Sequence, residues 1–118
     1  MKTRIITFGE KTVAGRIYTK DEVIIKDNPM FVIFGTTKSD ATINLEDIVG
    51  RATITVDDIG IDAEIEYLYT DRRHLFDYFC DAGLVNKEIV YPVGVGEMRD
   101  NNEVVNYLLL YLQHPRTI

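Results

Sequence analysis

Apolar and polar residues alternate along two neighbouring segments in the middle of the chain. From Arg51 to Asp57 the apolar residues occupy even positions, and from Ile61 to Tyr69 they occupy odd positions. This period of two is typical of a strand with one buried face. The turn residues of the segment 57–60 separate the two strands and predict an antiparallel hairpin.

The register of this hairpin follows if Val56 faces Ile61 across the turn. Arg51 then lies opposite Glu66 on the solvent side. The apolar face is predicted to carry four residues, namely Ile54, Val56, Ile61 and Ile65.

Other apolar runs predict further strands. The continuous run Met30–Phe34, between Pro29 and Gly35, indicates a strand covered on both faces. A first strand is expected from Thr3 to Phe8, and a last hairpin is expected to join two strands through a turn at residues 99–102. Those two strands run over Ile89–Met98 and Glu103–Gln113.

Two segments predict helices. The sequence Thr19-Lys20-Asp21-Glu22 has the form of a capping box and predicts a short helix at about residues 20–26. Thr70 is a candidate N-cap for a second helix, and Gly83 is well placed as its stop. The apolar stripe of that helix comprises Leu75, Phe76 and Phe79.

These elements predict an α+β fold, either a mainly antiparallel β-sheet or a small barrel, with one or two short helices. No repeat, low-complexity stretch or linker divides the chain, so residues 1–118 are expected to form a single strand-rich domain.

The last predicted strand, Glu103–Gln113, is apolar on both faces beyond Asn106. The predicted helices are too few to cover both faces, and a large uncovered apolar patch is uncommon on a soluble monomer. We therefore expect a protein interface at Tyr107, Leu109 and Tyr111, covered by another copy of the chain or by a different protein. The alternative is a closed small barrel that buries this face within the chain.

Composition and charge narrow the classes of partner. The 118 residues include 19 acidic and 13 basic side chains, which gives a net charge of −6. This charge opposes binding to nucleic acid and to anionic lipid. No apolar run approaches the roughly 20 residues of a membrane-spanning helix, and the first residues are too short for a signal peptide, so a cytoplasmic location is expected from the residues alone.

Candidate catalytic residues are few. The only serine, Ser39, lies in a polar loop without nucleophile-elbow glycines, while the two histidines, His74 and His114, lie on the predicted helix and in the tail. A hydrolase of the serine type needs a base beside its nucleophile, and these positions do not suggest such a pair. We therefore expect Ser39 to be an ordinary loop serine and the histidines to be surface residues. Cys80, the single cysteine, is expected to be a small packing residue.

No metal or cofactor site is predicted. Four acids crowd one hairpin, but their spacing does not match a calcium loop, and turn aspartates on a solvated face explain them. Gly94 and Gly96 lead into a strand and lack a third glycine, so close backbone packing or a bulge is expected instead of a dinucleotide site. The four acids are Asp57, Asp58, Asp62 and Glu64.

The segment Ala14–Val23, with its Gly-Arg-Ile-Tyr core, resembles the opening of tailed-phage prohead proteases. The segments Tyr91–Glu97 and Asn102–Leu110 are similar to the closing strands of that family, and Ala63-Glu64-Ile65 fits its intermediate hairpin. Thr19 replaces the proline that is usual in the family. The family uses a histidine and a serine within the sheet, and the matching strand positions here carry neither.

The resemblance implies a protease-like fold without proteolysis. We therefore expect a non-enzymatic virion structural protein, a capsid auxiliary or decoration protein that binds the major capsid protein or copies of itself. Its location would then be the virion. A small prohead maturation protease and an intracellular inhibitor that binds a host protein are the alternatives, and no cofactor is implied.

Overall fold

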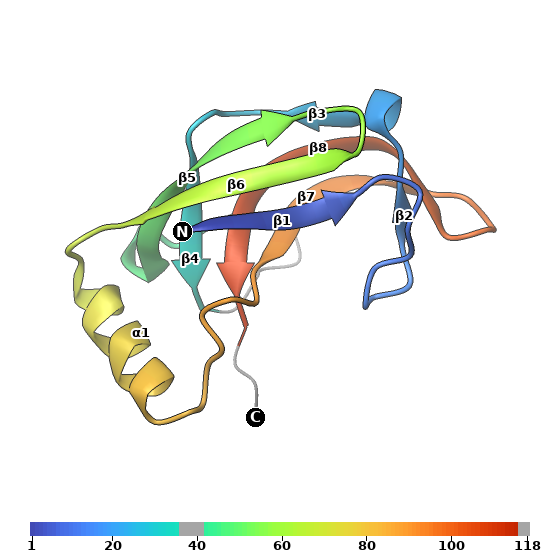
Figure 1. The fold of residues 1–118 in the computed structure, drawn as a ribbon. Coiled ribbons are helices and arrows are strands. Elements are labelled where there is room, and N and C mark those ends of the chain that lie inside the picture. The colour runs from blue at the N-terminus through green and yellow to red at the C-terminus, as the bar shows by residue number, and fades with distance from the viewer. Residues whose placement is uncertain (36–41, 116–118) are drawn as a thin grey trace.

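The computed structural model describes residues 1–35 and 42–115, which form one mixed sheet of eight strands with a helix at one end (Figure 1). The strands are β1 (Lys2–Thr7), β2 (Ile17–Tyr18), β3 (Val23–Ile25), β4 (Met30–Phe34), β5 (Ile48–Val56), β6 (Gly60–Tyr67), β7 (Tyr91–Met98) and β8 (Glu103–His114). The helix is α1 (Asp71–Asp81), and two 3-10 turns are η1 (Lys20–Glu22) and η2 (Leu45–Asp47). No helix in the described part of the chain is long and apolar enough to cross a membrane.

The sheet curls into a nearly closed barrel whose central strand is β8 (Figure 1). One edge of β8 pairs in parallel with β2, β3 and β4 in turn, and its other edge pairs antiparallel with β7. The remaining strands continue from β4 through β5 and β6 to β1 in antiparallel fashion. The prediction of a strand-rich fold with a helix is therefore confirmed, and the nearly closed sheet is compatible with a small barrel, but the strand pairing is mixed and not purely antiparallel.

The central hairpin confirms the predicted register. Val56 pairs with Ile61 and Arg51 pairs with Glu66, whose carboxylate lies 2.9 Å from the Arg51 guanidinium. Ile54, Ile61 and Ile65 face the core. Val56 is the exception, because it is 43% exposed at the end of its strand.

Asp57 accepts hydrogen bonds from the amides of Ile59 and Gly60 at 2.8 and 2.9 Å, as a turn aspartate does. The hydrogen bond from Gly60, and to a smaller extent the one from Ile59, holds the pKa of the Asp57 carboxyl below its ordinary value.

Helix α1 also forms as predicted. The Thr70 hydroxyl accepts a hydrogen bond from the Arg73 amide at 3.2 Å, and Gly83 follows the helix with a positive φ of 75°. Phe76 is fully buried, and Phe79 packs against the core. Leu75, by contrast, is 40% exposed, so the buried stripe is narrower than predicted.

The prediction of a helix at residues 20–26 is wrong. Only the single turn η1 forms, and Thr19 makes no side-chain cap. The Glu22 carboxylate instead accepts a hydrogen bond from the Asn106 amide at 2.8 Å, and the next three residues form β3 beside β8. Val23 and Ile25 pack on the core from this strand, and that burial outweighs the local capping signal.

Strand β8 departs from the strict alternation that the sequence predicts. Its pairing with β7 shifts at two places, and each shift adds one residue to β8. Asn106, at one of these bulges, has a positive φ of 51°. The core-facing residues of β8 are consequently Val104, Tyr107, Leu109 and Leu112.

Tyr111 belongs to a second, smaller cluster with Ile33 and Ile48. Ile43 and Leu68, from connecting segments, pack against this cluster. The chain therefore covers both faces of β8 here with its own residues, and Met30–Phe34 is confirmed as a strand buried on both sides at Ile33.

Candidate functional site

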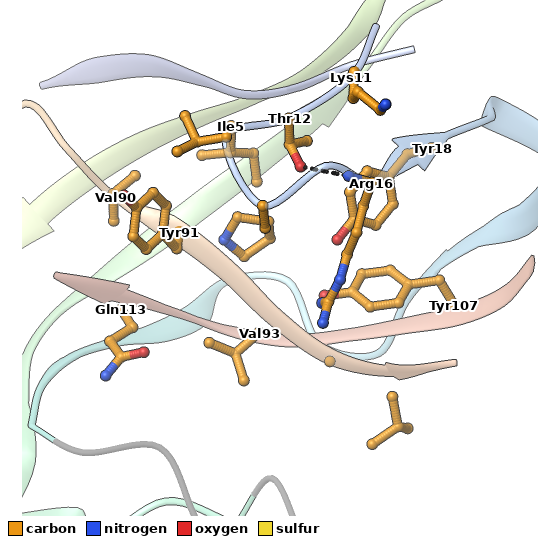
Figure 2. A pocket seen from close by; sticks show the side chains of 15 residues that line it. Ile5, Lys11, Thr12, Arg16, Tyr18, Val90, Tyr91, Val93, Tyr107 and Gln113 are labelled. Atoms are coloured by element: carbon orange, nitrogen blue, oxygen red, sulfur yellow. Dashed lines mark hydrogen bonds between the residues drawn. The ribbon is translucent and has the colours of Figure 1, made fainter. Parts of the chain in front are cut away.

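An open groove of about 760 Å³ lies where the sheet fails to close, between the chain after β1 and strand β7 (Figure 2). Ile5 of β1 and the segment Val90–Val95 line it, as does the stretch from Lys11 to Arg16. Tyr18, Tyr107 and Gln113 complete the lining. The lining is mostly apolar and aromatic with few polar groups, which is typical of a binding site.

A small hairpin positions the cationic side of the groove. Lys11 bridges Ile17, the Thr12 amide donates to the Arg16 carbonyl at 2.8 Å, and the Gly15 amide donates to the Thr12 carbonyl at 2.8 Å. Gly15 has a φ of 80°, a conformation that glycine adopts without strain. We call residues 11–17 the entry hairpin. The Thr12 hydroxyl accepts a further hydrogen bond from the Arg16 amide at 3.1 Å, which holds the turn closed (Figure 2).

Two tyrosines form the inner wall of the groove. The rings of Tyr18 and Tyr107 meet edge to face with their centroids 5.0 Å apart. Burial, followed by the influence of Tyr18, raises the pKa of the Tyr107 hydroxyl, so this group stays a neutral phenol at physiological pH. The tyrosine wall, formed by these two buried rings, therefore presents an uncharged phenol at Tyr107.

Gly94 makes room for this wall. A Cβ atom at Gly94 would lie 2.7 Å from Cζ of Tyr107 and would overlap the Leu108 carbonyl oxygen. Gly96 meets the backbone of Tyr107 in the same way, with a Cβ only 3.0 Å from its Cα. The expectation that both glycines serve close packing beside a bulge is confirmed.

The second polar constellation is buried beneath α1. His114 is fully buried; its Nδ1 lies 2.9 Å from the Ile89 carbonyl oxygen and its Nε2 lies 2.9 Å from the Tyr67 hydroxyl. A carbonyl oxygen only accepts, so Nδ1 carries the proton and Nε2 accepts from Tyr67. Burial lowers the pKa of His114 to about 4. This histidine was expected on the surface and is instead a neutral core residue.

Neither histidine forms a nucleophile and base pair in the described part of the chain. His74 is exposed on α1, His114 is sealed in the core, and Ser39 lies outside the described residues. Cys80 is half-buried and packs against the core, and burial raises the pKa of its thiol, which fits the predicted packing role.

The acidic hairpin forms ion pairs instead of a metal site. Asp62 lies 2.6 Å from the Arg4 guanidinium, Asp58 pairs with Lys20, and Glu64 lies 3.6 Å from the terminal amine of Met1. Over residues 1–35 and 42–115 no group of three or more His, Cys, Asp or Glu side chains is arranged to hold a metal ion.

The predicted protein interface at Tyr107, Leu109 and Tyr111 needs correction. These side chains are 4%, 0% and 3% exposed, so the chain itself covers nearly all of their surface. The two bulges of β8 also place them in different clusters, with Tyr107 and Leu109 in the main core and Tyr111 in the second. Only Tyr107 contributes to the groove, as part of its wall.

Sequence reasoning missed Arg16 and Lys11 as site residues. Both are exposed on the entry hairpin beside the groove. Gly15, which indicates a turn, was the only local signal. Side chains at positions i and i+2 of an extended segment, such as Arg16 and Tyr18, point to the same side, but this alternation does not show what they face. The surface that the entry hairpin faces is provided by β7, which lies more than 70 residues further along the chain.

Comparisons with known families, curated proteins and solved structures find no match to this chain. The function must therefore be inferred from the residues and geometry of the chain itself.

Proposed function

We propose that the protein is a non-enzymatic binding protein that holds part of another protein in the groove between the entry hairpin and β7. The observation that carries this proposal is the lining of the groove. It offers apolar side chains and a tyrosine wall, but none of the described residues that line it has a carboxylate, imidazole or thiol that would serve as a general base or metal ligand. Such a surface is suited to recognition.

In its specific form, the protein is a capsid auxiliary or decoration protein of a tailed phage, and the partner is the major capsid protein. The support for this form is the sequence resemblance around Gly15-Arg16-Ile17-Tyr18, and two residues of this segment, Arg16 and Tyr18, line the groove. A segment that resembles this family, at a groove whose described residues include no catalytic pair, fits a protein that binds without cleaving.

Co-sedimentation with assembled capsids tests the proposal. The protein is expected to migrate with particles of the corresponding phage in a saturable number of copies. Tyr91→Asp, which places a charge at the groove mouth where Tyr91 is 42% exposed, should abolish this migration. Tyr69→Asp is the matched control, since Tyr69 is 96% exposed and does not line the groove.

Three outcomes would contradict the proposal. Absence of the wild-type protein from particles would exclude the capsid role, and equal migration of both variants would exclude the groove. If the wild-type protein cleaved the capsid protein and Ser39→Ala abolished this cleavage, the protein would be a protease instead.

A further inference from the structure

We infer that the groove takes an extended segment of the partner that carries an aspartate or glutamate, and that Arg16 binds this carboxylate. The inference rests on the proposed function, because it assumes that the groove binds protein, and it names the chemistry of the segment that binds.

Arg16 stands apart from the other arginines in the described part of the chain. Every other described arginine pairs with a carboxylate within 4 Å, whereas Arg16 has no such partner among the described residues. The paired arginines are Arg4, Arg51, Arg72, Arg73 and Arg99. The planar guanidinium is suited to two parallel hydrogen bonds with a carboxylate, and here that capacity is free.

The Arg16 side chain reaches across the groove toward Tyr107 (Figure 2). The positive charge of Arg16 favours a lower pKa of the Tyr107 hydroxyl, although burial has the larger effect and raises that pKa. A carboxylate bound to Arg16 would thus lie against the tyrosine wall, where lower exposure to water strengthens a charge-assisted hydrogen bond.

The charge distribution favours an acidic occupant over a basic one. The chain has a net charge of −6, yet the described residues that line the groove include Lys11 and Arg16 and no acidic residue. A locally positive groove on an acidic protein attracts a negative segment and repels a positive one, which supplies specificity as well as steering.

The sheet edge favours an extended segment. Strands β1 and β7 end the sheet on either side of the groove, and in the described structure β7 pairs only with β8. An unpaired edge presents backbone donors and acceptors to which an extended peptide can add as a strand. Pro92 has no amide proton to donate, and of the β7 residues that follow it Val93–Val95 line the groove, so a segment in the groove is expected to pair with this stretch.

Selection from a random peptide library against the immobilised full-length protein tests the inference. The enriched peptides should contain an Asp or Glu flanked by apolar residues at alternate positions. Arg16→Gln should weaken their binding about ten- to hundredfold, because a charge-assisted hydrogen bond is lost. Arg51→Gln is the matched control on the far hairpin and should change binding less than about twofold.

Two further readouts apply to the selected peptides. Binding should weaken as salt rises, and amide NMR shifts should change at Val93 and Val95 more than in β5. Enrichment of peptides without an acid, equal binding by Arg16→Gln, or failure to enrich any peptide would overturn the inference. So would displacement of the peptides by decanoate at lower concentration, which would assign the groove to a small amphiphilic carboxylate.

The two proposals can fail separately. If Arg16→Gln still migrates with capsids and no acidic peptide is enriched, the acidic segment is wrong while the capsid role stands. If acidic peptides bind through Arg16 but the protein never associates with particles, the capsid role is wrong while the chemistry of the groove stands.

Discussion

The two hydrogen bonds of His114 fix its protonation state. The ring donates from Nδ1 to the Ile89 carbonyl and accepts at Nε2 from Tyr67, so a second ring proton would remove the acceptor of the Tyr67 hydroxyl proton and place a charge in the core. The Lys87 amine lies 4.5 Å from the centre of the Tyr67 ring, and its charge also disfavours the charged imidazole. Neutral His114 is thus built into the packing beneath α1.

This arrangement predicts that acid destabilises the fold through His114. The pKa of His114 is about 4 in the folded chain and 6.5 in an ordinary environment, so the unfolded chain binds the proton first as pH falls. Stability should be fully present above about pH 6.5 and should fall by on the order of 3 kcal/mol as the pH drops toward 4.

An NMR titration of the ring protons checks this directly, with exposed His74 as the internal reference. Urea unfolding at pH 7 and pH 4.5 then measures the loss of stability, and His114→Gln, which lacks the titrating ring, should show a smaller pH dependence. A His114 ring that titrates near 6.5 in the folded protein would contradict the assignment.

At the residue scale, the sequence could not predict the burial of His114. A polar residue near the end of a chain gives no local signal of burial, and its partners Tyr67 and Ile89 come from segments 47 and 25 positions away. Thr70 and Asp57 were predictable, because their hydrogen bonds reach only two or three residues along the chain.

At the scale of elements, the central hairpin was predicted with its register because alternation and turn chemistry agree there. The segment 20–26 and strand β8 were not, for two physical reasons. Pairing with β8 overrides the capping signal at Thr19, and two bulges in β8 exchange the faces that strict alternation assigns. A bulge that only a partner strand stabilises leaves little trace in the sequence.

The hairpin carries a stability prediction. Ile65 is 3% exposed in the core, so Ile65→Ala should lower the free energy of unfolding by about 2–5 kcal/mol through lost burial and a cavity. Val56→Ala on the same hairpin is the control, because Val56 is 43% exposed and should cost less than about 1 kcal/mol. Urea unfolding measures both, and equal losses would show that the assigned faces are wrong.

At the scale of the whole molecule, the groove exists because the barrel does not close. The entry hairpin and the β7–β8 hairpin, which carries Tyr107, come from distant parts of the chain, and the topology alone brings them to one opening. Local patterns predict strands but not which edges remain unpaired, so the sequence indicated a small barrel without locating its opening. That Arg16 lacks a carboxylate partner among the described residues is likewise visible only once the structure has paired the other described arginines.

Hydrogen exchange tests whether the sheet is open between β1 and β7. Amides of β5 and β8 lie in strands paired on both sides and should exchange slowly, whereas amides on the unpaired edges of β1 and β7 should exchange much faster. Because alternate amides of an edge strand point away from its one partner, β7 should show alternating protection and not uniform protection. Addition of a peptide that binds the groove should slow exchange at Val93–Val95 and leave β5 unchanged. Uniform protection along β7 equal to that of β5 in the free protein would show that the barrel is closed by hydrogen bonds to β1, and the edge would then have no backbone groups to offer to a partner.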